Sequence, residues 1–339
     1  MIFICDFPPG FTGAKHHGSG VGGTEALVAV LAETLAARGI DVTVATQVPH
    51  PSTFRGVAYL PVDSARPGGA QAAVLVKRWS DAASAARATR FFLATDVHVP
   101  DPAELARNIA WSSVSAALSP YMRSRLTAVV AAPRMEVLPP PLILADYPSP
   151  AGPRGPALLY CSMPDRGLYY LKDLFPAIRR YVPNATLTIT SDFTLWGKAG
   201  AKEAFLRFFA GQPGIRYLGH VERATLVAEQ RRARVMAYPC TFEEGFCIAA
   251  AECMAAGTVP VTTAGFALTT TVGEAGVLVK GRPRSWFYRR NFVKAAVKLL
   301  MDDAYWQDRS GACLNHAQSW DASLVADRFL ALVGGSDRR

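Results

Sequence analysis

The sequence has 339 residues, of which 50% are hydrophobic and 19% are charged. This length suits two domains of about 100–200 residues each, and the composition excludes a disordered, fibrous or collagen-like chain. The net charge of +9 lies almost wholly in the second half: residues 1–150 hold 12 Lys and Arg against 11 Asp and Glu, which leaves 24 against 16 for residues 151–339. A basic second half indicates either a polyanionic ligand or a solvated basic face.

The six cysteines form no C-x-x-C pair, so the zinc and redox spacings are absent. Several of them lie in apolar stretches, which favours buried free thiols in a reducing compartment. There is no run of about 18 apolar residues and no basic segment before the first apolar run, so neither a membrane span nor a signal peptide is indicated. We therefore expect a cytoplasmic protein.

The first 46 residues predict a strand, a glycine-rich loop, a helix and a second strand. Residues 2–5 form a short apolar run, and six glycines follow between residues 10 and 23. Apolar residues then recur at helical spacing over residues 27–35, and residues 40–46 are rich in β-branched side chains. Such a βαβ unit has a right-handed crossover and a parallel strand pair.

The same pattern begins again in the second half. Residues 157–161 predict a strand, residues 162–167 a turn, residues 168–178 a helix and residues 185–190 another strand. Strand-like stretches continue at residues 216–218, 234–238 and 259–262. The expected fold class is therefore α/β, with two doubly wound, Rossmann-like parallel-sheet domains that face a cleft.

The domain boundary is expected in the stretch from Pro139 to Gly155, which holds six prolines and two glycines. We predict a first domain over residues 1–145 and a second over residues 155–318. Residues 319–336 predict a final helix that packs back on the first domain.

The segment with the clearest chemistry spans residues 238–263. It predicts a strand, a loop with Glu244 and Gly245, a helix from Phe246 or Cys247 to Ala256, and a strand. Free amides at a helix N-terminus, together with the helix dipole, make an anion site. Gly245 would let the backbone approach a ligand closely.

Glu252 lies in a helix that is otherwise small and apolar. A carboxylate buried there is costly unless it accepts hydrogen bonds. Sugar hydroxyls would satisfy it, and Glu244 in the preceding loop would hold a second set. A structural ion pair for Glu252 is the alternative that the residues leave open.

The run from Glu244 to Val261 resembles the E-G-F-G-x-x-x-x-E signature of the retaining glycosyltransferases of family 4, which have the GT-B fold. The resemblance implies that Glu244 contacts the donor sugar and that Glu252 holds the ribose hydroxyls. It also implies that the amides of Phe246, Cys247 and Ile248 meet the sugar and the diphosphate. Cys247 departs from the pattern, because the family usually has glycine there.

Two further stretches resemble the same family. Residues 160–168 resemble the strand and loop that usually read G-R-x-x-x-x-K-G, with Ser162 near the missing arginine and Arg166 in place of the phosphate-binding lysine. Arginine suits that role because its planar fork binds phosphate bidentately. Residues 215–221 resemble the strand and turn beside the nucleotide base, which places His220 and Val221 at that pocket.

In the first domain, the resemblance is less specific. Gly22 and Gly23 would form the glycine loop that faces the donor phosphates or the acceptor. His98 follows a strand-like run at residues 91–94 and would serve as an acceptor-side histidine, although a lone histidine is more often structural.

The resemblance implies transfer of a glycosyl group from a nucleoside diphosphate sugar to an acceptor hydroxyl with retention of configuration. Glu244, Arg166 and His98 are the candidate catalytic residues, and Arg166 with the helix N-terminus would stabilise the departing diphosphate. No D-x-D motif is present, so we expect no metal and no cofactor besides the nucleotide-sugar substrate. The acceptor would be a glycan, a lipid-linked sugar or a small molecule.

Three alternatives belong to other classes. An epimerase on the same fold would need no acceptor, and a nucleotide-sugar binding protein would have no activity. A dehydrogenase would need G-x-G-x-x-G after a strand, a spacing that residues 18–23 do not keep. No nucleic-acid reader motif is present. Peripheral contact with the inner membrane face stays open, although the nearly neutral first half offers it little electrostatic support.

Overall fold

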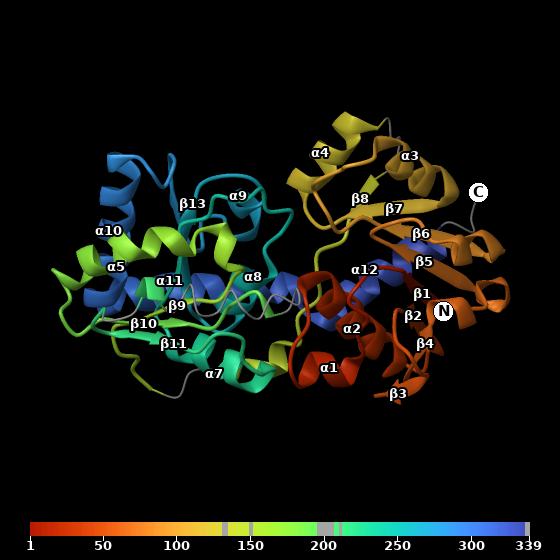
Figure 1. Cartoon of the computed structure of the whole chain (residues 1–339), viewed down its shortest axis with the longest axis horizontal. Coiled ribbons are helices and arrows are strands. Elements are labelled where there is room, and N and C mark those ends of the chain that lie inside the picture. The colour runs from red at the N-terminus through yellow and green to blue at the C-terminus, as the bar shows by residue number, and fades with distance from the viewer. Residues whose placement is uncertain (131–134, 149–151, 195–206, 210–211, 336–339) are drawn as a thin grey trace. The chain divides into compact units, whose positions relative to one another are not determined.

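The computed structural model describes residues 1–130, 135–148, 152–194, 207–209 and 212–335 (Figure 1). The chain divides into two compact units, one formed by Met1–Ile143 with Trp320–Arg339 and the other by Leu144–Ser319. The boundary at Ile143 falls in the proline-rich stretch, and the C-terminal helix belongs to the first unit.

The first unit is built on a sheet of eight strands in the order β3-β4-β2-β1-β5-β6-β7-β8. All neighbouring strands are parallel except β3 and β4, which form an antiparallel pair. The strands are β1 (Ile2–Cys5), β2 (Val42–Thr46), β3 (Ser52–Phe54), β4 (Val57–Pro61), β5 (Ala72–Val76), β6 (Thr89–Leu93), β7 (Val114–Ala117) and β8 (Met135–Val137).

Helices surround this sheet: α1 (Gly13–His17), α2 (Gly23–Ala36), α3 (Pro102–Trp111), α4 (Pro120–Val129) and α12 (Ala322–Gly334). Helix α12 packs on α2 and β6, and its Phe329 ring lies against Phe3 and Phe91. Arg38 donates to Asp327 on α12 at 2.6 Å. The last helix therefore completes the hydrophobic core of the first unit.

The second unit has a fully parallel sheet of six strands in the order β11-β10-β9-β12-β13-β14. The strands are β9 (Ala157–Tyr160), β10 (Thr186–Ile189), β11 (Ile215–Tyr217), β12 (Val235–Tyr238), β13 (Val259–Thr263) and β14 (Val277–Val279). Parallel strands buried on both faces read as continuous apolar runs, and each residue of β12 is buried.

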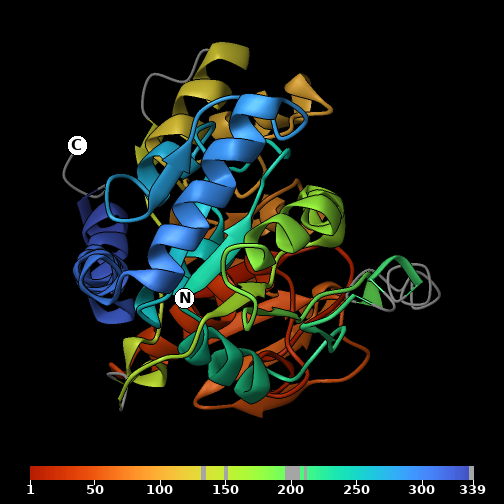
Figure 2. The same ribbon diagram turned by 90° about the vertical axis from the view of Figure 1, so that its left-hand side faces the viewer.

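Two helical layers cover this sheet. One contains α5 (Leu171–Arg179) and α10 (Trp286–Met301), which pack on each other (Figure 2). The other contains α7 (Arg223–Arg232), α8 (Ile248–Ala255) and α11 (Asp303–Ala317), with the short α9 (Leu268–Thr271) near the end of β13. Right-handed crossovers place α5 and α8 on opposite faces, because β10 and β13 lie on opposite sides of the pair β9 and β12.

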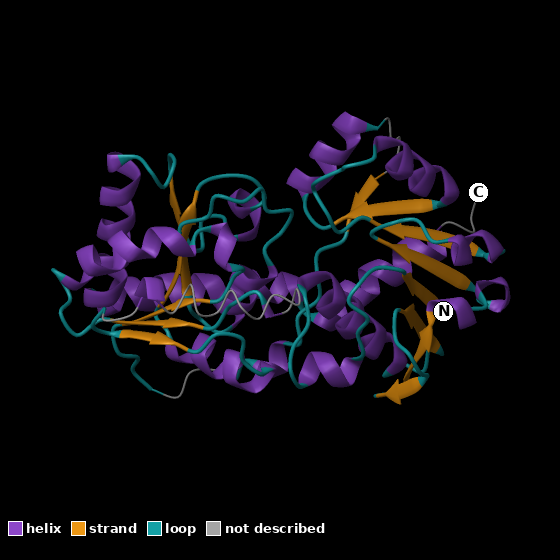
Figure 3. Cartoon of the chain, viewed as in Figure 1, coloured by secondary structure: helices purple, strands orange, loops and turns teal. Residues whose placement is uncertain are grey.

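Both units are thus α/β layers around parallel sheets, with strands at the centre and helices outside (Figure 3). The expected fold class of two Rossmann-like domains is confirmed. Within the described ranges, every helix is too short or too polar to cross a bilayer.

Candidate functional site

The strand order of the second unit reverses between β9 and β12, because β10 and β11 continue to one side and β12 begins the other. In open α/β sheets, ligands bind outside the carboxyl ends of the strands at such a switch point. Here β9 leads into Ser162 and Arg166, and β12 leads into Glu244. The sequence positions singled out for chemistry therefore meet at the position that the topology favours.

Arg166 and Glu244 form an ion pair at this point. The Arg166 Nη1 donates to both carboxylate oxygens of Glu244, at 3.0 and 3.3 Å. The Tyr238 hydroxyl donates to the same carboxylate at 2.5 Å and accepts from the Ser162 hydroxyl at 3.2 Å. Glu244 is only 3% exposed, so the charge is held in place by these partners instead of by water.

The electrostatics of this cluster follow from burial and pairing. Burial is the largest single cause and lowers the pKa of Arg166, but the charge and hydrogen bond of Glu244, together with Tyr238 and Cys247, outweigh it and raise the pKa above its usual value, so the guanidinium stays protonated. Burial, and then the charge of Glu244, raise the pKa of Tyr238 well above its usual value, which keeps the hydroxyl a donor. The Arg166 guanidinium also lies 4.2 Å from the centre of the Phe242 ring.

The loop that presents Arg166 is packed tightly against the loop after β12. Gly167 has φ of +139°, and a Cβ there would lie 2.3 Å from the carbonyl oxygen of Pro239. The Thr241 amide donates to the Arg166 carbonyl at 3.1 Å. Only glycine allows the two loops to approach this closely, and this approach fixes the position of the Arg166 backbone relative to Glu244.

Helix α8 begins at Ile248, one or two residues later than the expected start at Phe246 or Cys247. The reason is the backbone of Cys247, which has φ of +77° and is therefore left-handed. Its carbonyl still accepts the first helical bonds, from the amides of Ala250 and Ala251. The resemblance to a family with glycine at this position is consistent with that conformation. Gly245 is half-buried, and Phe246 is buried, in the loop that leads to the helix.

Glu252 holds a second buried network. One carboxylate oxygen accepts from Arg223 on α7 at 2.6 Å, and the other accepts from the fully buried Gln230 at 3.0 Å. Arg223 also donates to the Tyr147 hydroxyl at 2.7 Å. Glu252 therefore forms the structural ion pair that the sequence analysis left open as an alternative, and both of its carboxylate oxygens accept hydrogen bonds from protein donors.

The two networks contain buried polar atoms without partners. Among the described residues, the Nε atoms of Arg166 and Arg223 and the Oε1 of Gln230 make no hydrogen bond. A buried donor or acceptor without a partner costs about 1–3 kcal/mol. All three atoms belong to residues of the Glu244 and Glu252 networks, and all three are buried.

His220 and Val221 follow β11 and are half-buried. The His220 amide donates to Asp192, which also accepts from the Thr194 amide, at 3.0 and 2.8 Å. Burial raises the pKa of Asp192, but the side chain and amide of Thr194 and the amide and charge of His220 together outweigh it and hold the pKa below its usual value. Asp192 thus orders the turn that carries His220.

The remaining predicted residues belong to the first unit. Gly22 caps the N-terminus of α2, and Gly23 is its first residue. A Cβ on Gly22 would lie 2.4 Å from the buried Glu25 carboxylate. His98 is exposed and lines a small cavity of 90 Å³ that also contains Lys77 and Asp96, which form an ion pair at 3.1 Å.

Four residues of the two networks were not predicted from the sequence: Tyr147, Arg223, Gln230 and Tyr238. Tyr238 could have been found from the sequence, because it places a polar hydroxyl at the carboxyl end of a buried strand, directly before the Glu244 loop. The other three come from elements that only the tertiary fold brings to α8.

One protein-family model matches part of the second unit. Residues 155–302 match the family described as Glycosyl transferases group 1, and this range lies within the second unit. The matched range includes Ser162, Arg166, Glu244 and Glu252.

Solved structures share the fold over nearly the whole chain. Sucrose-phosphate synthase from Thermosynechococcus elongatus is 16% identical, with 99% of this chain and 98% of that chain covered and a TM-score of 0.74. Anabaena Alr3699/HepE, in complex with UDP-glucose, is 14% identical, with coverage of 99% and 100% and a TM-score of 0.75. WaaG, a glycosyltransferase involved in lipopolysaccharide biosynthesis, is 14% identical, with coverage of 99% and 100% and a TM-score of 0.67.

The fold is accordingly that of the GT-B glycosyltransferases. At these identities the likeness concerns the fold alone. None of the curated protein sequences matches this one.

Proposed function

We propose that this protein transfers a glycosyl group from a nucleoside diphosphate sugar to an acceptor hydroxyl, with retention of configuration and without a metal ion. The observation that carries the proposal is the pair of buried carboxylate networks at the switch point of a Glycosyl transferases group 1 domain.

In this proposal, Glu252 and its neighbours bind the ribose. Its oxygens accept from Arg223 and Gln230, but each carboxylate oxygen has a second lone pair for a hydroxyl. The ion pair then orients the carboxylate before the donor arrives. Such preorganisation lowers the entropic cost of binding.

The diphosphate would lie between Arg166 and the N-terminus of α8. The side chain of Arg166 is 24% exposed. Its buried Nε has no hydrogen-bond acceptor among the described residues. As the bond to the sugar breaks, negative charge grows on the diphosphate, and a fixed cation with helix amides stabilises it. These groups supply the charge that a metal supplies in other transferases. Retention rests on the family resemblance of the Glu244 segment.

Glu244 would accept from hydroxyls of the donor sugar while Tyr238 and Arg166 hold its orientation. His98 is proposed to take part on the acceptor side, in the first unit. The acceptor would be a glycan, a lipid-linked sugar or a small molecule. UDP-sugars are the first donors to test, because the Anabaena structure with this fold contains UDP-glucose.

The decisive experiment separates the structural role of Glu252 from donor binding. Glu252→Gln leaves Arg223 buried without a charged partner, which should cost about 3–5 kcal/mol of folding free energy. The double variant with Arg223→Gln removes both charges and should recover most of that loss. Thermal shifts with UDP, GDP, ADP and their sugar conjugates then report donor affinity, since a ligand of the folded state raises the melting temperature.

We expect the wild type to be stabilised by one nucleotide class and both variants to lose that shift. The matched control is Arg289→Gln with Asp173→Asn, which removes another ion pair of the same unit, at 2.9 Å, and should keep the shift. If the Glu252 and Arg223 double variant retained the full donor shift, Glu252 would be a structural bridge only. Donor consumption without an acceptor, yielding an isomerised sugar, would indicate an epimerase.

A further inference from the structure

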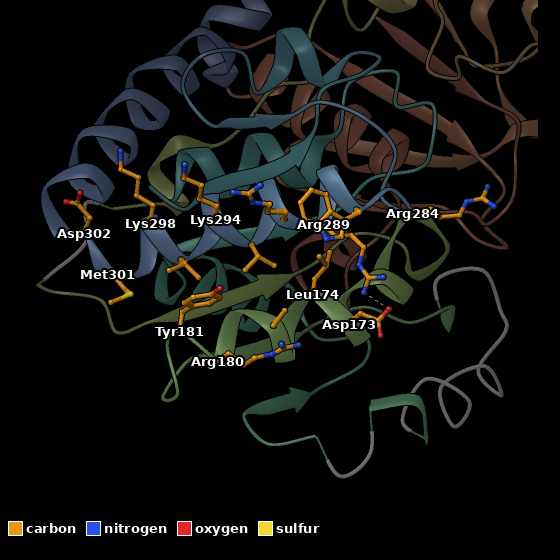
Figure 4. Close-up of a pocket in the computed structure, with 15 residues that line it drawn as sticks. Asp173, Leu174, Arg180, Tyr181, Arg284, Arg289, Lys294, Lys298, Met301 and Asp302 are labelled. Atoms are coloured by element: carbon orange, nitrogen blue, oxygen red, sulfur yellow. Dashed lines mark ion pairs between the residues drawn. The ribbon is translucent and has the colours of Figure 1, made fainter.

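The outer layer of the second unit carries a groove that the proposed transferase site does not use. It lies between α5 and α10 and has a volume of 810 Å³ (Figure 4). Its floor is aliphatic and includes Leu174, Ala177, Val293 and Val297. We name this groove and its rims the α5–α10 face.

The rims of the α5–α10 face are strongly basic. Six cations line it, against two acids: Arg180, Arg284, Arg289, Arg290, Lys294 and Lys298 against Asp173 and Asp302. Asp173 pairs with Arg289 at 2.9 Å, so its charge is locally balanced. The face therefore has a net charge of +4, which is nearly half of the chain's net +9.

Large apolar side chains protrude beside these cations. Trp286 is 63% exposed, Phe287 70%, Tyr181 65% and Met301 65%. They are four of the five most exposed large hydrophobic side chains in the described part of the chain. Arg290 lies 5.4 Å from the centre of the Trp286 ring, so cationic and aromatic groups are interleaved.

The exposed side of α10 combines cations with aromatic rings, while its apolar side is buried in the protein. Arg290, Lys294 and Lys298 recur at intervals of four residues and form one exposed row, and Figure 4 shows Lys294 and Lys298 side by side along the helix. Trp286 and Phe287 lie in its first turn and Met301 in its last, while Tyr181 follows α5. Interfacial helices combine Lys and Arg with Trp, Phe and Leu in this way, because the rings enter the headgroup region while the cations meet anionic lipids.

We propose that the α5–α10 face docks the protein on an anionic lipid bilayer. Charge complementarity selects the occupant, since a polyanionic surface neutralises the row of cations. Nucleic acid would match the charge as well, but it offers no apolar phase for Met301 and the aliphatic floor. A bilayer satisfies both kinds of side chain at once.

The test is co-sedimentation of the full chain with vesicles of equal parts phosphatidylcholine and phosphatidylglycerol, and with vesicles of phosphatidylcholine alone. We expect binding to the anionic vesicles only, weakened by salt. Arg290→Glu with Lys294→Glu should lower the partition coefficient by about tenfold or more. Trp286→Ser with Phe287→Ser should also lower it, with a loss that high salt does not remove.

The matched control reverses two exposed cations elsewhere, Arg87→Glu with Arg123→Glu, which gives the same net charge. It should bind as the wild type does. Equal loss in the control variant, or no binding of the wild type to anionic vesicles, would overturn the proposal. A third result would also overturn it. If single-stranded oligo-dT displaced the protein from the vesicles, and the Arg290 and Lys294 variant lost oligo-dT binding, the face would be assigned to nucleic acid.

The proposal does not depend on the transferase assignment. The Arg290 and Lys294 variant should keep its melting temperature and any nucleotide-induced shift of the wild type, because neither residue belongs to the Glu244 or Glu252 network. Vesicle binding without a donor shift would leave the α5–α10 face established and the transferase proposal in error. A donor shift without vesicle binding would support the transferase proposal and overturn the proposal for the α5–α10 face.

Discussion

Cys247 shows how one residue decides where a functional helix starts. Its left-handed backbone ends the loop from Glu244 and lets α8 begin at Ile248. Residues with a side chain adopt this conformation at a cost of about 1–3 kcal/mol. The thiol is buried beside Glu244, and burial followed by that charge raises its pKa well above the usual range. It therefore stays neutral.

Replacing Cys247 with glycine should change the free energy of unfolding by less than about 1 kcal/mol, because the relief of strain offsets the cavity left by the buried thiol and the added entropy of the unfolded chain. Equilibrium denaturation measures the change. The same substitution at Cys313, which is fully buried within α11, should destabilise by about 1–3 kcal/mol, since it adds glycine to a helix and opens a cavity. An equal loss of stability at both positions would contradict the strain argument.

At the scale of elements, the site depends on how two loops at adjacent strand ends approach each other. Gly167 brings the loop after β9 against Pro239 in the loop after β12. The bond from the Thr241 amide to the Arg166 carbonyl joins the same two loops. The position of Arg166 relative to Glu244 is therefore a property of the pair of loops and not of either one.

Gly167→Ala should destabilise the protein by about 2–6 kcal/mol, the combined cost of positive φ and of overpacking against the Pro239 carbonyl. It should also weaken nucleotide binding, because Arg166 is displaced. Gly39→Ala is the control: its φ is +82°, but a Cβ there meets no atom within 4 Å. It should cost about 1–2 kcal/mol. Equal effects of the two substitutions in denaturant titrations would exclude the proposed packing role of Gly167.

At the scale of the whole molecule, both units keep cysteine thiols in apolar cores. Burial is the main cause that raises the pKa of Cys5, Cys240, Cys247, Cys253 and Cys313, to about 12 for Cys240 and Cys313. In the unfolded chain a thiol ionises near a pH of about 8.5. The folded state therefore binds more protons than the unfolded state above that pH.

Stability should consequently fall as pH rises above about 8.5, by about 1.4 kcal/mol per pH unit for each of these thiols, until the folded pKa is reached. Denaturant midpoints across the alkaline range, under reducing conditions, measure the slope. Cys313→Ala should reduce the slope by one thiol's share, whatever its effect on stability at neutral pH. A pH-independent midpoint above pH 9 would show that the thiols are not buried as described.

The sequence by itself determined the two α/β units, because the alternation of apolar strands, glycine turns and amphipathic helices is local information. It also singled out Glu252 as a carboxylate in an apolar helix and Glu244 in the loop before it, and the family resemblance added Arg166; the roles of these residues in donor binding stay a prediction. These positions fall within the matched family range of residues 155–302.

Only the tertiary structure decided what those residues touch. Arg166 pairs with Glu244, 78 positions away, and Arg223 reaches Glu252 from a different helix. The α5–α10 face likewise combines side chains from residues 173–181 with others from residues 284–302. No local pattern encodes such pairs, because the order of strands in a sheet brings together residues that are far apart in the chain.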